Sequence, residues 1–404
     1  MDTHRPALDW IDQQVPALTE ELMALAAINS GSFNADGVTR VAERLAPRFA
    51  ALADEVEWIE VAPYRSTAND GSRRERGLGK ALRLRKRAGA PLRFFAGGHL
   101  DTVFPVDSPF QTARRLGEDR LNGPGVADLK GGLLVLWLAL AALERSPQRE
   151  RIGWELLFNP DEEIGSQSSA PLLREAAGRN HFGLIYEPAY PDGSLASARK
   201  GSGNFDVVVR GRAAHAGRDF HAGRNAVVAA AHLVQGLAAL NGERGALTLN
   251  PAFISGGGPL NIVPDLAVLK FNVRTEAAAD EDWLQAQLER LLGELQSVEG
   301  ITVSVHGGFT RPPKPFDARN QHLAGLIQDC GRALNLPLAF KPTGGCCDGN
   351  NLHAYGLPNV DNLGVVGGEI HSDREWMSIP SLAERGKLSA LLLLRLANGE
   401  LSWT

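Results

Sequence analysis

The chain has 404 residues, of which 44% are hydrophobic and 22% are charged, and its formal net charge is −5. This length exceeds what one ordinary hydrophobic core accommodates, so we expect two domains in a soluble globular protein. The acidic balance, with a pI of about 6.1, argues against a general nucleic-acid-binding protein, which would carry a basic face.

The N-terminal sequence, the apolar runs and the cysteines indicate in which compartment the protein is expected. The N-terminal sequence lacks the pattern of a signal peptide, and the longest apolar run, 133–143, is too short to span a membrane. Three cysteines (Cys330, Cys346 and Cys347) are too few for a disulfide framework, and the last two are adjacent. We therefore expect a cytoplasmic protein in a reducing compartment, with no membrane partner.

The first 197 residues alternate between predicted helices and strands. Apolar residues recur at helical spacing over 10–28 and 34–52, and 55–63 alternates as a strand does. The next elements are a strand at 92–101, a helix at 128–145, a strand at 151–159, a helix at 170–179 and a strand at 181–190. This alternation predicts an α/β domain, in which functional residues collect at the carboxyl ends of the strands.

A basic segment interrupts this pattern, with eight lysines and arginines between Arg73 and Arg87. Its charges alternate with alanine and leucine. This pattern favours a solvated hairpin over an anion-binding face.

The pattern changes near Ser197. Residues 201–217 are predicted to form a long strand leading to a loop with His215. The following elements are a helix at 225–240, strands at 246–257 and 267–277, a helix at 280–298 and a strand at 301–309. The order β-α-β-β-α-β is typical of a ferredoxin-like α+β domain. We expect residues 198–311 to form this domain, inserted into a discontinuous catalytic domain of residues 1–197 and 312–404.

Two motifs carry most of the functional information. In GGHLDTVF, His99 follows two glycines at a strand end, and Asp101 is placed to fix the second ring nitrogen. In NPDEEIGS, Glu162 and Glu163 are adjacent, and crowding of two carboxylates raises one pKa toward the range of a general base. Taken singly, the first motif is also typical of a hydrogen-bonded loop histidine and the second of an acidic first turn of a helix.

Three further residues extend this set. Asp128 lies in a loop with four glycines, which allow a close approach to a ligand, although a helix N-cap also explains this acid. Glu187 ends an apolar strand, and His371 follows a glycine-rich strand end. Imidazole nitrogens and carboxylate oxygens bind divalent metals, so the set predicts a site for two ions with one carboxylate left as a base.

The motifs H-x-D, G-x-x-D-x-K-G-G and D-E-E-x-G, in this order, resemble a known family. It is the di-zinc metallopeptidase family of glutamate carboxypeptidase, acetylornithine deacetylase, succinyl-diaminopimelate desuccinylase and aminoacylase. The resemblance runs from about Trp10 to the last helix and is strongest to the glutamate carboxypeptidase branch. It implies a catalytic domain with a mixed sheet flanked by helices and an inserted dimerisation domain.

The resemblance also implies the roles of the site residues. His99 and Glu187 resemble ligands of one zinc, and Glu163 and His371 resemble ligands of the second zinc. Asp128 resembles the carboxylate that bridges both ions, and it is followed by a cis peptide bond in the family.

Other positions resemble the catalytic machinery of the family. Glu162 resembles the general base, Asp101 the partner of His99, and His215 a residue that reaches into the neighbouring subunit's site in a homodimer. There His215 would donate a hydrogen bond to the developing oxyanion. Less directly, the resemblance assigns substrate binding to Asn261, Arg274, Arg311 and Gly344, with Arg311 gripping a substrate carboxylate in a two-pronged contact.

The implied activity is hydrolysis of an amide bond in a small amino-acid-derived substrate, by a carboxypeptidase or by an N-acyl-amino-acid deacylase. Zinc is implied, and cobalt or manganese fit the same ligands. A catalytically silent relative and a metal-dependent phosphoesterase are the competing interpretations. Retention of Glu162 argues against the first, and the few cations near the site, Lys130 and Arg311, argue against the second. The two cysteines in GGCCDGN, the basic segment and ARKGSG depart from the family pattern and leave the substrate open.

Overall fold

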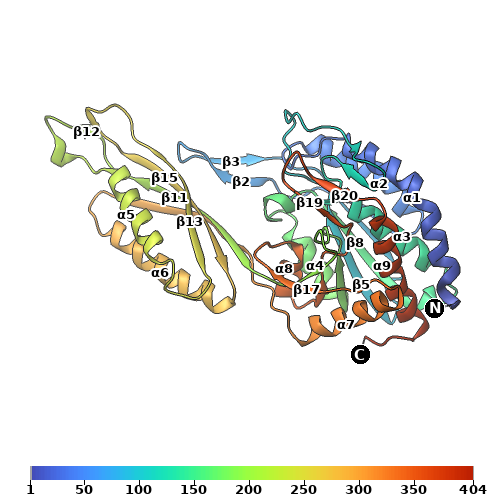
Figure 1. Cartoon of the computed structure of the whole chain (residues 1–404). Helices are drawn as coiled ribbons and strands as arrows, with labels where there is room; N and C mark the ends of the chain where they lie inside the picture. The colour runs from blue at the N-terminus through green and yellow to red at the C-terminus, as the bar shows by residue number, and fades with distance from the viewer. Residues whose placement is uncertain (1, 404) are drawn as a thin grey trace.

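The computed structural model describes residues 2–403, which form two bodies (Figure 1). The larger body contains both ends of the chain, and the smaller body contains the residues between Gly201 and Arg311. The expected fold class is confirmed: a mixed sheet flanked by helices, with an α+β domain inserted into it.

A six-stranded sheet organises the larger domain, in the order β1-β4-β8-β5-β9-β18. Its strands are β1 (Glu55–Ile59), β4 (Ala81–Lys86), β8 (Ile152–Asn159), β5 (Leu92–His99), β9 (Phe182–Ile185) and β18 (Asn359–Val360). Strand β4 pairs antiparallel with β1 and β8, and the other pairings of the sheet are parallel. The carboxyl ends of β8, β5, β9 and β18 therefore meet at one edge of the sheet, where α/β proteins place their ligands.

Helices cover both faces of this sheet. On one face lie α1 (Arg5–Ala26), α2 (Ala35–Ala50), α3 (Lys130–Glu144), α7 (Ala318–Ala333) and α9 (Ser381–Asn398), and on the other α4 (Ala170–Arg179) and α8 (Asp348–Ala354). Helix α3 is apolar on nearly all sides because it is packed between the sheet, α1 and α9. Among residues 2–403, no helix is both long enough and apolar enough to cross a membrane.

The inserted domain has its own antiparallel sheet and its own hydrophobic core. Its elements are β11 (Gly201–Arg210), α5 (Ala226–Ala239), β13 (Thr248–Gly256), β15 (Leu266–Thr275), α6 (Ala278–Gln296) and β16 (Thr302–Arg311). The strand order β13-β15-β11-β16, with both helices on one face, is that of a ferredoxin-like domain (Figure 1). Strand β13 lies at an edge, where its outer hydrogen-bonding groups have no strand partner in the described chain.

Short strands complete the connections. The pairs are β10 (Leu195–Arg199) with β17 (Phe340–Thr343), and β12 (Ala214–His215) with β14 (Ile262–Val263). A small sheet contains β19 (Gly367–Gly368), β20 (Trp376–Ser378), β7 (Arg120–Asn122) and β6 (Arg114–Arg115). This sheet holds the last loop of the site against the larger domain.

The prediction of one solvated hairpin over Arg73–Arg87 is wrong. A hairpin does form, from β2 (Tyr64–Thr67) and β3 (Arg73–Arg76), and it projects toward the inserted domain (Figure 1). Residues Ala81–Lys86 instead form β4, inside the main sheet between β1 and β8. Leucine alternates with arginine there because one face of β4 is buried, while Arg83 forms ion pairs with acids of neighbouring elements.

Candidate active site

Loops at the carboxyl edge of the main sheet bring the expected ligand residues together. In chain order they supply His99 at the end of β5, Asp128 before α3, Glu162 and Glu163 after β8, Glu187 after β9 and His371 after β19. One ligand atom each of His99, Asp128 and Glu163 lies within 4.8 Å of the others, which is the spacing of a metal-binding group.

Asp128 stands between the two imidazoles. Its Oδ1 lies 3.1 Å from His99 Nε2, and its Oδ2 lies 3.4 Å from His371 Nε2. Glu187 Oε2 lies 3.9 Å from the same His99 nitrogen, and Glu163 Oε2 lies 3.3 Å from the same His371 nitrogen. The residues therefore form two adjacent groups that share Asp128, each with one imidazole and one further carboxylate.

Asp101 orients both the first histidine and the paired glutamates. The His99 Nδ1–H donates to the Asp101 carbonyl oxygen at 2.9 Å, which turns Nε2 toward Asp128. The Asp101 carboxylate accepts hydrogen bonds from the Ser32 hydroxyl at 2.6 Å and from the backbone N–H groups of Glu162 and Glu163 at 3.2 Å. The position of the paired glutamates thus depends on the same acid that fixes His99.

Glu375 is a site residue that the sequence motifs did not reveal. Its buried carboxylate accepts hydrogen bonds from the backbone N–H groups of Gly125, Ala127 and Asp128 at 2.9–3.1 Å. These bonds hold the Asp128 loop, in which the Asp128–Leu129 peptide bond is cis, as the family resemblance implied. The only available signal was its place four residues after His371 in EIHSDREW.

A glycine allows the Asp128 loop to approach Glu187. A Cβ atom built on Gly132, in the first turn of α3, would lie 2.0 Å from the Tyr186 carbonyl oxygen. No other residue fits there without moving the backbone. This close contact between α3 and the end of β9 places Asp128 and Glu187 on the same side of His99.

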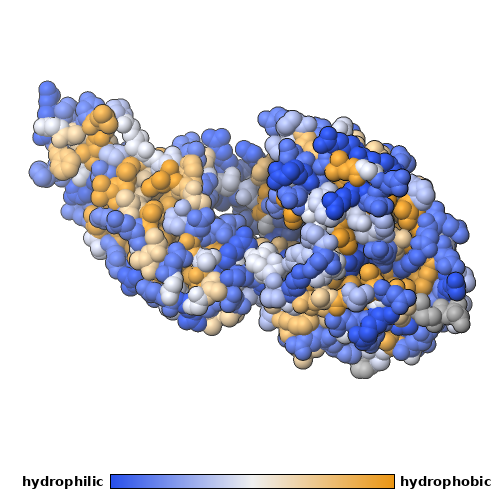
Figure 2. All heavy atoms as spheres, in the orientation of Figure 1, coloured by the Kyte–Doolittle hydropathy of each residue, from blue (hydrophilic) through white to orange (hydrophobic). Residues whose placement is uncertain are grey.

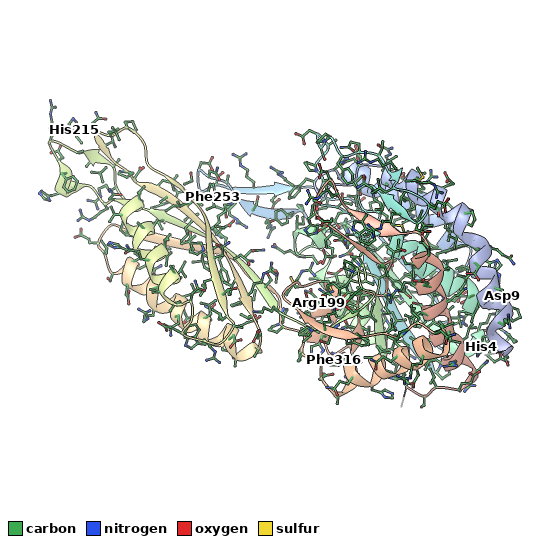
Figure 3. All side chains as sticks on the ribbon, in the orientation of Figure 1. His4, Asp9, Arg199, His215, Phe253 and Phe316 are labelled. Atoms are coloured by element: carbon green, nitrogen blue, oxygen red, sulfur yellow. The ribbon has the colours of Figure 1, made fainter. Side chains whose placement is uncertain are left out.

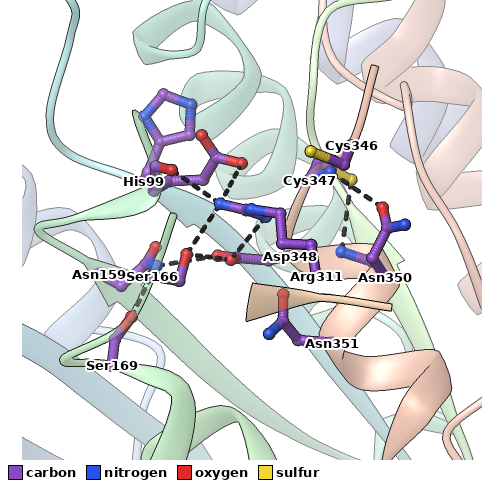
Figure 4. Close-up of polar contacts among 12 residues, drawn as sticks. His99, Asn159, Ser166, Ser169, Arg311, Cys346, Cys347, Asp348, Asn350 and Asn351 are labelled. Carbon is purple, nitrogen blue, oxygen red and sulfur yellow. Dashed lines mark hydrogen bonds and ion pairs between the residues drawn. The ribbon is translucent and has the colours of Figure 1, made fainter. Parts of the chain in front are cut away.

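Arg311, from the end of β16, lies beside Asp348 and Ser166 (Figure 4) and also contacts the expected general base Glu162. Its Nη2 lies 2.8 Å from Glu162 Oε1 and donates to the Glu162 carbonyl oxygen at 2.7 Å. Its Nη1 lies 3.3 Å from Asp348 Oδ1, and Asp348 also accepts a hydrogen bond from the Asn159 side chain at 2.8 Å. These side chains are all buried, so the chain's own acids engage the guanidinium that was expected to bind a substrate carboxylate.

The pKa values reflect this crowding. Burial raises the pKa of Glu162, although the charge of Arg311 acts to lower it. Burial and the neighbouring Asp128 raise the pKa of Glu163 to about 8, and hydrogen bonds with Asp128 and Glu163 raise the pKa of His371 to about 10. Burial also raises the pKa of Glu187 well above its ordinary value. Bound divalent cations would relieve this unfavourable concentration of buried carboxylates, so the donor set fits metal ions.

The group opens onto a cleft of about 650 Å³, lined by residues of both domains. The molecular surface is hollowed where the two domains meet (Figure 2). Arg274 lines this cleft with its Nη1 3.2 Å from Cys346 Sγ, and it forms no ion pair with any residue of the described chain. Gly344 lies in the loop after β17, between two residues, Thr343 and Gly345, that line the cleft.

His215 and Asn261 are far from this cleft. His215 lies exposed at the outer tip of the inserted domain (Figure 3). The Asn261 carbonyl oxygen accepts a hydrogen bond from the Ala216 N–H at 2.9 Å, so both residues belong to the same tip. Neither His215 nor Asn261 therefore contacts the metal-binding group of the same chain.

Paired imidazole–carboxylate groups at the end of a mixed sheet define a dinuclear metallohydrolase. Residues 95–395 match the family described as "Peptidase family M20/M25/M40". The chain therefore belongs to this peptidase family, and it is a metal-dependent hydrolase of amide bonds.

Individual relatives agree with this assignment. The chain is 28% identical over 397 residues to carboxypeptidase G2 of Pseudomonas sp. (strain RS-16), covering 96% of this chain and 91% of the relative. It is 28% identical to succinyl-diaminopimelate desuccinylase of Bordetella parapertussis, covering 75% and 82% of the two chains. Its fold matches the crystal structure of aminopeptidase PepT from Bacillus cereus with a TM-score of 0.70 at 22% identity, covering 95% and 99%.

Proposed function

We propose that the protein binds two zinc ions and removes an amino acid that carries a free carboxylate from an acyl or peptidyl group. Its substrate is then either a dipeptide-like molecule or an N-acyl amino acid. One observation carries this proposal: the two oxygens of Asp128 face two separate imidazoles, each with a further carboxylate beside it. This arrangement fits one ion with His99 and Glu187 and a second ion with His371 and Glu163.

Two bound zinc ions would supply Lewis acidity and lower the pKa of a bound water from 15.7 toward about 7. The chain's own residues then perform the proton transfers. Glu162, which is no member of either ligand group, accepts a proton from the attacking water and passes it to the departing amine. The raised pKa of Glu162 suits both steps, and its contact with Arg311 fixes the direction of its carboxylate.

Arg274 is the cation best placed to bind the carboxylate of the substrate. It lines the cleft and has no acidic partner in the described chain, whereas the guanidinium of Arg311 is already paired with Glu162 and Asp348. A guanidinium recognises a carboxylate through two parallel hydrogen bonds. We assign Arg274 to substrate binding and Arg311 to positioning of the base.

A homodimer would bring a second histidine to each site. His215 lies at the tip of the inserted domain, where it can serve only a neighbouring molecule. The unpaired edge strand β13 exposes Phe253 and Ile254, and Val228 of α5 is exposed on the same domain, whose surface is apolar over α5 (Figure 2). Two copies joined along β13 would form one continuous sheet and cover these side chains.

A cytoplasmic location stays a prediction from the three free cysteines.

Hydrolysis assays on the zinc-loaded protein test this function. We expect turnover of N-acyl amino acids or of dipeptides with a C-terminal acidic residue, loss of turnover after chelation, and recovery on adding zinc back. Dipeptides and N-acyl amino acids assayed side by side separate the peptidase from the deacylase. Turnover of phosphate esters alone, or zinc binding with no amide turnover, would contradict the proposal.

A further inference from the structure

A second hollow lies beside the metal-binding group and differs in character from the main cleft. Its volume is about 450 Å³, and its lining includes Phe33, Thr102, Val103, Val106 and Ile164. None of the three cleft arginines, Arg199, Arg274 and Arg311, lines it. The main cleft is therefore lined by arginines together with the acids of the site, whereas the hollow is mainly apolar, with Arg76 and Glu163 as its charged residues.

The two cavities meet at the catalytic residues. Glu163 and Ile164, directly after the expected base Glu162, line both of them. If the scissile amide carbonyl of the substrate lies beside Glu162, the amine portion of the substrate can occupy one cavity and the acyl portion the other. If the amine portion with its carboxylate lies toward Arg274, the acyl portion has the second hollow left to it.

The apolar side chains of this hollow are unusually accessible. Phe33, Val103 and Val106 have exposed fractions of 45%, 38% and 71%. Clustered exposed apolar groups beside a reacting centre mark a binding surface for an apolar ligand group. An apolar ligand group that binds in this hollow would remove its own apolar surface and that of these side chains from water.

The projecting hairpin β2–β3 builds one wall of the hollow. Tyr64 and Arg76 face each other across this hairpin, and Tyr64 lines the main cleft while Arg76 lines the hollow. The Phe33 ring packs against both, with its centroid 5.4 Å from that of Tyr64 and 4.8 Å from the Arg76 Cζ. The hairpin thus holds the aromatic floor of the hollow in place through Tyr64 and Arg76.

We propose that this hollow binds the acyl side of the substrate and selects bulky apolar acyl groups over small ones. This inference rests on the proposed amide hydrolysis and specifies its substrate class. The hairpin shapes this preference because it supplies Arg76 and supports Phe33.

The test compares kcat/KM for N-acetyl, N-hexanoyl and N-phenylacetyl derivatives of one amino acid. In the wild-type protein we expect the two larger substrates to exceed the acetyl compound by more than about ten-fold, since each methylene in an apolar pocket contributes strongly to discrimination. Val103→Asp and Phe33→Ala should remove most of this preference by lowering kcat/KM for the two larger substrates more than for the acetyl compound. Val298→Asp, at an exposed valine of the inserted domain, is the matched control and should keep the preference.

The outcomes separate this inference from the proposed function. Hydrolysis of all three substrates without an acyl preference would overturn the acyl pocket and leave the amidase intact, whereas no hydrolysis of any amide would overturn the proposed function itself. Equal losses for all substrates in Val103→Asp, together with dissociation of the dimer on gel filtration, would show that a partner subunit occupies the hollow and would also contradict the proposal.

Discussion

Similar carboxylates have different immediate partners at this site, and we assign them different tasks on that basis. Asp128 lies between two imidazoles, Glu162 contacts a guanidinium, and Glu375 accepts hydrogen bonds from three backbone N–H groups. Partners rather than residue type decide whether an acid binds a metal, moves a proton or holds a loop. Each of these three roles predicts a different result on mutation.

Glu162→Gln removes the proposed proton acceptor and nearly preserves the shape of the side chain. We expect kcat to fall by roughly 10²–10⁴-fold, since general acid–base catalysis contributes about this much. Zinc content, measured by elemental analysis, should stay at the wild-type value because Glu162 belongs to neither ligand group. Glu289→Gln, on the outer surface of α6, serves as the control. Near-normal turnover in Glu162→Gln would refute the role of this residue.

Glu375→Ala leaves three backbone N–H groups of the Asp128 loop without their acceptor. Residues that orient metal ligands typically contribute about 10–100-fold to metal affinity. We expect zinc affinity, measured by competition with a chelator, to fall by this factor while the far-ultraviolet circular dichroism spectrum is retained. An unchanged zinc affinity would show that the loop keeps its position without Glu375.

At the scale of elements, one buried acid joins the two segments that connect the domains. Asp361, just after β18, lies 2.8 Å from Arg199 Nε and 2.8 Å from Lys314 Nζ. Arg199 precedes β11 and Lys314 follows β16, and their backbones are paired with each other. The entrance and the exit of the inserted domain are therefore fixed to the edge of the main sheet by the same carboxylate.

Asp361→Asn should lower the free energy of unfolding by about 3–5 kcal/mol at pH 7, because it leaves two buried cations without their counter-charge. Although burial opposes it, the pairing with Arg199 and Lys314 lowers the pKa of Asp361 to about 2 from its ordinary 3.8. A lowered pKa gives stability that is complete above the ordinary value and is lost as the pH falls toward 2. The difference in the free energy of unfolding between the wild type and Asp361→Asn should therefore shrink by about 2 kcal/mol as the pH falls from 5 to 2.

Urea unfolding across this pH range measures the effect. Glu294→Gln, which removes an exposed ion pair with Arg290, should change stability by less than about 0.5 kcal/mol. The account would be contradicted if the difference in the free energy of unfolding between Asp361→Asn and the wild type stayed constant from pH 5 to 2.

Sequence patterns predicted which segments form strands better than they predicted which strands pair with each other. The alternation around β11, β13 and β15 and the apolar runs of β5 and β8 marked these strands because each has one or two buried faces. The same rule applied to ALRLRK indicates a strand, but pairing with β1 and β8 is non-local, so β4 was predicted as part of a hairpin. Motifs likewise revealed His99 and Asp128, whereas Asp348 and Glu375 act through distant contacts that no local pattern records.

At the scale of the whole molecule, the proposed homodimer would complete the proposed active site. The metal-binding group and the base lie in the larger domain, whereas His215 lies exposed at the opposite end of the inserted domain (Figure 3). A crossed arrangement would give each site one histidine from the partner subunit. Complementation between two inactive variants tests this arrangement.

His215→Ala and Glu162→Gln should each be inactive alone while keeping zinc. After unfolding and refolding as a mixture, half of the dimers would be mixed, and each mixed dimer would contain one intact site, which predicts about a quarter of wild-type activity. The unmixed variants, refolded in the same way, are the controls. No recovery in the mixture, at a confirmed dimeric mass, would exclude the crossed site.

The central claim is that Asp128 bridges two metal ions. Crystals grown with excess zinc, with diffraction recorded on both sides of the zinc absorption edge, measure it directly. We predict two anomalous peaks about 3.5–4 Å apart, one beside His99 and Glu187 and the other beside His371 and Glu163. A single peak, peaks elsewhere in the molecule, or no peak among these side chains would contradict it.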